Sequence, residues 1–245
     1  MRELSTDRPD TTESPYTVDA GHFQLEMSFA DYTYDRSNPQ SQTSRSLSAA
    51  PMLLKVGLLN NVDLQIGLDP YNRVRTTDRI TDTTETIEGF GDTVARLKVN
   101  LWGNDEGPTA LALIPFLKFP TASQPPGNGN LEGGLIAPLA VSLPDEFSLG
   151  LMAELDFLRS EDDDRYVVDS VHTATVSRSL IGELGGFVEY AGFLNFNGDT
   201  NYRGYFNSGL TYGVTPDIQL DCGVRLGLTE AADDLGLFAG ISVRY

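Results

Sequence analysis

Few side chains of this chain could act as catalytic bases or nucleophiles. The 245 residues include two histidines, His22 and His172, and one cysteine, Cys222. Nucleophilic catalysis needs a base beside the attacking hydroxyl or thiol, yet the sequence has no Gly-x-Ser-x-Gly elbow and no serine two residues after His172. Metal-ligand spacing is also absent. We therefore expect a protein that is not an enzyme, and we expect no metal and no cofactor.

Two acidic features need separate consideration. Glu154 and Asp156 are two residues apart and would share one face of a strand, where paired carboxylates could do acid-base chemistry. The run at 161–164, Glu-Asp-Asp-Asp, could bind a divalent cation, because hard cations favour carboxylate oxygens. It lacks the spacing and the glycine of an EF-hand loop, so a solvated acidic loop is the favoured interpretation.

The remaining charged residues recur at alternate positions within strand-like segments. We predict that the following residues line a channel: Lys55, Arg96, Lys98, Lys118, Glu154, Asp156, Glu183, Glu189, Arg203, Asp221 and Arg225. Cations on one wall and carboxylates on the opposite wall would create a transverse field across a narrow pore. In the alternative, these groups pair with one another and with Glu26, Asp63 and Arg244, and only fill the lumen.

Period-two alternation of apolar and polar residues positions these side chains. From residue 22 onward it is interrupted only by turn residues, and helical periodicity is absent. The pattern predicts twelve strands, at 22–36, 44–58, 62–69, 93–102, 109–119, 131–143, 147–159, 166–180, 183–195, 202–214, 218–229 and 235–245. In the strand at 166–180, either His172, Ala174 and Val176 or their neighbours could form the apolar face.

The connections between these strands alternate in length. Every second one is a short turn rich in Gly, Pro, Asn and Asp, near residues 60, 105, 145, 182 and 216. The others are mostly longer and polar, and the longest is 70–92. An up-and-down barrel with short periplasmic turns and longer outer loops has this alternation.

The two faces of each strand indicate the surroundings of the barrel. At 235–245 one face is Leu, Leu, Ala, Ile, Val and Tyr, and the other is Gly, Phe, Gly, Ser and Arg. The mixed second faces would make a poor dry core but a suitable wet lumen, and the uncharged first faces suit lipid. Aromatic residues near the strand ends suggest two interfacial belts. The sequence thus predicts an all-β, 12-stranded antiparallel transmembrane β-barrel at 22–245.

Residues 1–21 precede the first strand and are polar. We expect this segment to enter the lumen from the periplasmic side and to narrow it, with Asp7, Arg8, Asp10 and Glu13 paired to wall charges. A loose periplasmic tail is the alternative. The first residues lack the apolar core of a signal peptide, so an exported chain would be a mature one.

Two stretches resemble a known family. The segment TDRPDTTESPYTV at 6–18, followed by GHFQLE at 21–26, resembles the opening of outer-membrane proteins named for the MetA pathway of phenol degradation. The C-terminal GLFAGISVRY at 236–245 resembles the signal read by the outer-membrane assembly machinery, although that signal often ends in Phe. The resemblance implies a barrel channel for small aromatic or otherwise hydrophobic compounds.

We predict a monomeric channel for passive uptake of small molecules across a bacterial outer membrane, in contact with its lipids, its lipopolysaccharide and the assembly machinery. The alternative is a non-conducting structural or surface-interaction barrel that uses 70–92 as its contact surface. The net charge of −18 makes nucleic acid an improbable partner.

Overall fold

The computed structural model describes the chain except residues 39, 123–126, 128, 161–164 and 197–201. The described residues form fifteen β-strands. Their bounds are β1 Phe23–Asp35, β2 Gln42–Ala49, β3 Met52–Leu59, β4 Val62–Leu68, β5 Tyr71–Asp78, β6 Thr84–Gly89, β7 Thr93–Trp102, β8 Thr109–Phe119, β9 Glu132–Ser142, β10 Phe147–Arg159, β11 Tyr166–Ile181, β12 Leu184–Asn195, β13 Arg203–Thr215, β14 Ile218–Gly227 and β15 Leu235–Arg244.

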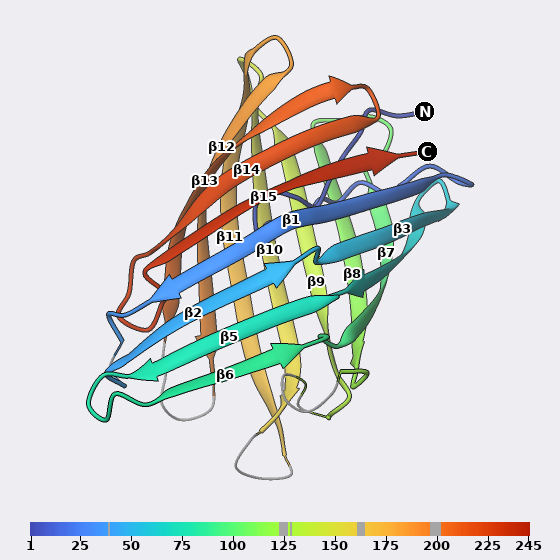
Figure 1. Ribbon diagram of the computed structural model, residues 1–245. Coiled ribbons are helices and arrows are strands. Elements are labelled where there is room, and N and C mark those ends of the chain that lie inside the picture. The colour runs from blue at the N-terminus through green and yellow to red at the C-terminus, as the bar shows by residue number, and fades with distance from the viewer. Residues whose placement is uncertain (39, 123–126, 128, 161–164, 197–201) are drawn as a thin grey trace.

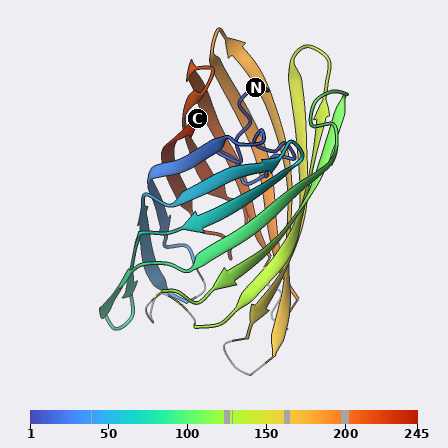
Figure 2. The same ribbon diagram turned by 90° about the vertical axis from the view of Figure 1, so that its right-hand side faces the viewer.

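These strands form one closed antiparallel barrel (Figures 1 and 2). From β7 to β15 each strand pairs with the next, β7 pairs with β4, and the β1–β15 pairing closes the barrel. β2 and β3 follow one another along the same edge of β1, and β4–β5 and β6–β7 are likewise two successive pieces of one strand. Counted in this way the barrel has twelve strands, as predicted.

The break between β2 and β3 divides the strand that we predicted at 44–58. Ala50 has a left-handed φ of 55°, and Pro51 has no N–H to donate to a ladder. At the same level of the facing strand β1, its register with β15 shifts between Ser28 and Ala30. The Ser28 N–H donates to the Pro51 carbonyl at 3.0 Å, which keeps the two strands joined across the break.

The longest predicted loop, 70–92, is mostly not a loop. It contains β5 and β6, which form a hairpin and extend the sheet beyond β2 (Figure 1). The prediction was wrong because this stretch has no uncharged apolar phase: Arg73 and Arg75 alternate with Asn72 and Val74. Main-chain hydrogen bonds with β2 hold this stretch as a strand, although its side chains lack the apolar-polar alternation typical of one.

The two ends of the barrel differ as expected. Both termini lie at the same end (Figure 1), and so do the short turns after β3, β7, β9, β11 and β13. In outer-membrane barrels this is the periplasmic end. We therefore call the opposite end, which carries the longer connections and the β5–β6 hairpin, the outer end.

The apolar face of each strand points outward, away from the lumen. Leu149, Leu151 and Leu155 of β10 pair directly with Val176, Ala174 and Ser170 of β11. Because directly paired residues share a face, Ala174, Val176 and His172 point outward, and Val171, Thr173 and Thr175 point inward, where they are buried. This settles the register of β11 that the sequence left open. The described part of the chain contains no helix long and apolar enough to cross a membrane.

Candidate functional site

The N-terminal segment, residues 1–21, enters the lumen from the periplasmic end (Figure 1) and is held against the wall formed by β1, β3, β4 and β7. Both carboxylate oxygens of Glu26 accept hydrogen bonds from the Asp7 N–H, at 2.9 and 3.1 Å, and one also accepts from the Arg8 N–H at 3.0 Å. Glu26 is only 1% exposed. A carboxylate that binds two successive main-chain N–H groups fixes the backbone and not only a side chain.

Two lysines of the wall surround the Asp7 carboxylate. The Lys98 ammonium lies 2.6 Å from one Asp7 oxygen, and the Lys55 ammonium lies 2.5 Å from the other and also contacts Glu26. Lys55 and Lys98 are 3% and 0% exposed. The two cations lower the pKa of Asp7 against the opposing effect of burial, the largest single influence on it. Asp7 is therefore ionised and tightly paired.

At two points the N-terminal segment passes so close to the barrel wall that the wall residue there is a glycine. At Gly57 of β3 a Cβ atom would lie 2.0 Å from the Asp19 carbonyl oxygen, and at Gly240 of β15 it would lie 2.4 Å from the Arg8 guanidinium. That guanidinium binds both oxygens of Asp221 on β14, at 2.6 and 3.1 Å. Such a two-pronged contact fixes the orientation of Arg8 as well as its position.

Residues 11 and 12 reach the opposite wall. Glu189 of β12, which is 2% exposed, accepts hydrogen bonds from the N–H groups of Thr11 and Thr12 at 2.9 and 2.8 Å and from the Thr12 hydroxyl at 2.6 Å. The same carboxylate accepts a hydrogen bond from the Asn207 side-chain amide at 2.6 Å. Thr12 also contacts the Thr173 hydroxyl at 2.6 Å. Glu189 thus repeats, across the lumen, the role of Glu26.

The segment then returns to its starting wall. The Glu13 carboxylate forms an ion pair with Arg96 of β7 at 2.5 Å. The Ser14 N–H donates to Asp7 at 2.8 Å, which closes residues 7–14 into a loop. This loop contacts β1, β3, β7, β11, β12 and β14, so it spans the lumen. We call residues 7–14 the plug.

Asp10 is the plug residue whose charge is least compensated. Burial raises its pKa to about 8, and the nearby Glu189 carboxylate adds to the shift, while a hydrogen bond with Thr175 opposes it. Glu189 accepts the four hydrogen bonds described above from Thr11, Thr12 and Asn207. Asp10 is consequently protonated at neutral pH and does not repel Glu189.

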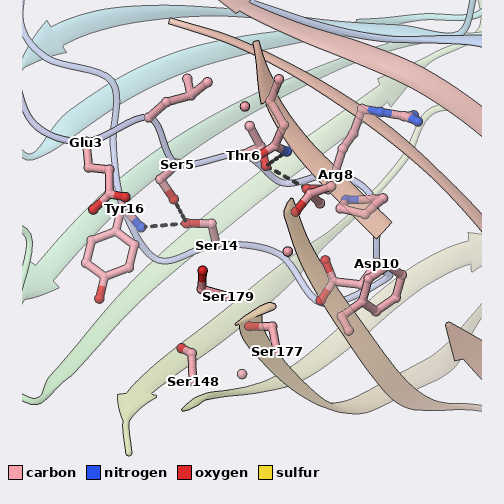
Figure 3. Close-up of a pocket in the computed structure, with 18 of the residues that line it drawn as sticks. Glu3, Ser5, Thr6, Arg8, Asp10, Ser14, Tyr16, Ser148, Ser177 and Ser179 are labelled. Carbon is pink, nitrogen blue, oxygen red and sulfur yellow. Dashed lines mark hydrogen bonds between the residues drawn. The ribbon is translucent and has the colours of Figure 1, made fainter. Parts of the chain in front are cut away.

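A cavity of about 1030 Å³ lies on the periplasmic side of the plug. One side of it is the N-terminal segment, and the other is the wall from β10 to β13, whose lining side chains are small and mostly hydroxylated (Figure 3). Ser148, Ser177 and Ser179 face the segment across this space. The Ser5 and Ser14 hydroxyls, 2.7 Å apart, border it from the segment. We call it the hydroxyl cavity.

On the outer side of the plug the lumen is partly apolar. Ile114, Ile136, Met152 and Val171, from β8 to β11, form a buried cluster, and Phe116 and Phe193 pack against it. The Phe193 ring meets the Tyr205 ring edge to face, with centroids 5.8 Å apart. We expected a lumen face of small, polar and charged residues, and this cluster departs from it. The residues of this cluster occupy inward-facing positions of their strands, as the polar lumen residues do. Strand alternation alone therefore could not distinguish an apolar cluster from a polar lumen at these positions.

The predicted lining residues divide into four groups. Lys55, Lys98, Arg96, Glu189 and Asp221 bind the plug, as described above. Lys118 pairs with Glu132 at 2.5 Å, Arg225 pairs with Asp31, and the Arg203 guanidinium stacks 5.3 Å from the Phe193 ring centroid. Glu154 and Asp156 lie side by side on β10. Glu183 lies in the turn before β12 and lines the hydroxyl cavity, so its placement within a strand was wrong.

The other chemical candidates lie outside the lumen or outside the described residues. His172 points outward and lies 2.9 Å from the Tyr202 hydroxyl. The acidic run at 161–164 is not among the residues that the structure describes. No group of three His, Cys, Asp or Glu residues among the described ones could hold a metal ion.

Comparisons with known proteins place this architecture among outer-membrane barrels. The structure resembles an outer membrane channel from Pseudomonas putida F1, with a TM-score of 0.68, 12% identity and coverage of 95% of this chain and 98% of that one. It also resembles the translocator domain of the autotransporter NalP from Neisseria meningitidis, with a TM-score of 0.57, 10% identity and coverage of 93% and 90%. The CymD monoaromatic hydrocarbon channel gives a TM-score of 0.51, 9% identity and coverage of 93% and 88%.

At these identities the likeness concerns the fold, which is that of bacterial outer-membrane proteins. No curated protein matches the sequence. A family profile covers residues 6–245, which include both the plug and the whole barrel. The chain therefore belongs to the family described as "Putative MetA-pathway of phenol degradation".

Proposed function

We propose that this protein is a channel for passive uptake of small molecules across the outer membrane, and that the plug controls its conductance. The observation that carries this proposal is the way in which the plug is held. Wall carboxylates and cations bind residues 7–14 from opposite sides of the lumen, whereas a hydroxyl cavity remains open beside the same segment. A barrel whose only task was structural would not need both an obstruction and a cavity.

Small aromatic or otherwise hydrophobic compounds are the solute class that we favour. The aromatic rings of Phe116, Phe193 and Tyr205 on the outer side of the plug could stack with such a solute before it passes. One structurally similar protein is described as a monoaromatic hydrocarbon channel. The hydroxyls beyond the plug would then hydrate the solute as it leaves.

A non-conducting barrel remains the second candidate, because the plug is held by residues of eight strands, namely β1, β3, β7, β10, β11, β12, β13 and β14. In either case we infer that the protein is monomeric, because one chain completes the barrel through the β1–β15 pairing and no second copy is needed to cover a strand edge. We also infer that the C-terminal strand β15 is recognised by the assembly machinery, and that the outer surface contacts lipopolysaccharide.

Deletion of residues 2–18 tests the proposed function. Single-channel conductance in planar lipid bilayers should rise severalfold over the intact protein, because the deletion removes the plug and joins the hydroxyl cavity to the outer lumen. Liposome swelling with aromatic acids, amino acids and sugars would then identify the solute. Equal conductance of the two proteins would contradict the role of the plug, and silence of both would favour the non-conducting barrel.

A further inference from the structure

The sheet at the outer end of the barrel changes from apolar to basic across its strands. One row of directly paired residues runs Leu235, Tyr34, Arg45 and Arg75, on β15, β1, β2 and β5 in turn. Directly paired residues lie on one face of a sheet. Asp31, three residues before Tyr34, points into the lumen toward Arg225, so this row points outward.

The neighbouring row repeats the change. It runs Leu237, Tyr32, Leu47 and Arg73 over the same four strands. In Figure 1 the strands β15, β1, β2, β5 and β6 follow one another away from the end that carries both termini. The rows therefore pass from apolar through aromatic to basic residues in the direction of the outer surface. A bilayer shows the same order from its hydrocarbon core through its interface to its headgroups.

The arginines of these rows have few partners within the chain. Arg45, Arg73 and Arg75 are exposed, and Arg45 lies directly opposite Arg75, where like charges destabilise a sheet. Glu88 is the carboxylate on this face, and it lies 3.8 Å from Arg73 and accepts a hydrogen bond from Tyr71. Within the described chain no ion pair involves Arg45 or Arg75.

We propose that Arg45, Arg73 and Arg75, the arginine patch, bind the phosphate groups of lipopolysaccharide in the outer leaflet. Guanidinium groups bind phosphate with two parallel hydrogen bonds. An anion between Arg45 and Arg75 would also remove their mutual repulsion. Charge complementarity carries the choice of partner: the patch is basic in a chain of net charge −18, and it faces the leaflet whose headgroups are phosphorylated glycolipids.

The test compares the intact protein with the double variant Arg45→Gln/Arg75→Gln, both purified in detergent. Rough-type lipopolysaccharide should raise the melting temperature of the intact protein, because a ligand that binds only the folded state stabilises it. The double variant should bind at least about tenfold more weakly, with a correspondingly smaller rise. Arg178→Gln is the matched control, because Arg178 also points outward and stacks on an aromatic ring, Phe147 at 4.8 Å, but lies at the periplasmic end.

Three further arms separate the sources of phosphate. Dephosphorylated lipopolysaccharide should stabilise the intact protein less than the phosphorylated form does. Phosphatidylglycerol micelles and inorganic phosphate should not reproduce the difference between the two proteins. The Lys-containing variant Arg45→Lys/Arg75→Lys should retain part of the effect, and the heat-dependent gel migration of each variant shows that its barrel has formed.

Equal binding by the folded double variant and the intact protein would overturn the proposal. So would equal binding of dephosphorylated lipopolysaccharide, or an identical loss with phosphatidylglycerol, which would indicate an unspecific anionic surface. None of these measurements depends on conductance, so the outcome is independent of the proposed channel function.

Discussion

The two sides of the barrel interior are filled in different ways. On the side of β1, β3, β4 and β7 the lumen-facing residues are long and charged or amide-bearing, and Glu26, Lys55, Gln65 and Lys98 are all at most 3% exposed. On the side of β10 to β13 the lumen-facing residues of the periplasmic half are mostly serine, threonine and glycine, and a cavity of about 1030 Å³ lies beside them.

This difference identifies the wall from which the plug can separate at the lowest cost in free energy. The plug is bound to the first side by buried ion pairs, whose loss leaves uncompensated charges. Toward the second side it makes fewer ionic contacts and faces open space. We therefore expect a solute to pass between the plug and the hydroxylated wall, with residues 10–12 moving more readily than residues 7, 8 and 13.

Removal of the two buried cations should have the largest effect. In Lys55→Met/Lys98→Met the Asp7 and Glu26 carboxylates lose their cationic partners, and breaking such a buried pair costs about 3 to 5 kcal/mol. The plug should leave the wall, and single-channel recordings should show long openings with a conductance near that of the deletion protein. Lys118→Met is the control, because Lys118 pairs with Glu132 and touches no plug residue that the structure describes. Wild-type conductance in a folded double variant would contradict the claim that buried ion pairs of this wall hold the plug.

A smaller effect is expected from pH. The pKa of Asp10 is raised to about 8 from an ordinary value of 3.8 when the plug is bound inside the barrel, which we call docked. At neutral pH Asp10 therefore holds a proton in the docked plug and releases it when the plug leaves the wall. Docking is consequently most stable at low pH and weakens as the pH rises from about 4 to 8. The open probability in bilayers should increase over this range.

Asp10→Asn should remove most of that pH dependence, because the amide keeps the shape and carries no charge beside Glu189. Asp145→Asn, in the exposed periplasmic turn after β9, is the control and should leave the profile as it is. A variant at Asp10 with an unaltered pH profile would show that another group governs docking.

The smallest effect is expected from narrowing the hydroxyl cavity. Ser177 lines it, and Ser177→Phe should lower the conductance of the deletion protein by a modest factor and slow liposome swelling most for the largest solutes. Val176→Phe places the same ring on the outward face one residue away. If both variants behaved alike, the path would not run along this wall.

Much of the barrel could be predicted from the sequence because strand alternation is a local property. Leu149, Leu151 and Leu155 occupy every second position of β10, and hydrocarbon imposes this pattern without help from distant residues. The prediction failed at β5 and β6, outside the hydrocarbon layer. There Arg73 and Arg75 occupy the outward positions that apolar residues hold in the other strands. Main-chain pairing with β2, and not side-chain alternation, therefore makes this stretch a strand.

The plug was only partly predictable. Its polar composition and its charged residues suggested that Asp7, Arg8, Asp10 and Glu13 would enter the lumen. Their partners depend on contacts between residues up to 213 positions apart in sequence, as between Arg8 and Asp221, and no local pattern encodes such a pairing. The main-chain contacts of Glu26 and Glu189 were not foreseen, since a carboxylate that binds N–H groups has no signature in the sequence.

The sequence by itself thus determined that the chain forms a twelve-stranded barrel with one face toward lipid, because alternation and turn chemistry act over a few residues. The tertiary structure alone decided how the lumen is filled. Barrel closure brings β1, β7 and β12 around the N-terminal segment. Because charges buried there must be paired, the charged residues of these strands determine where the plug binds and which wall stays open.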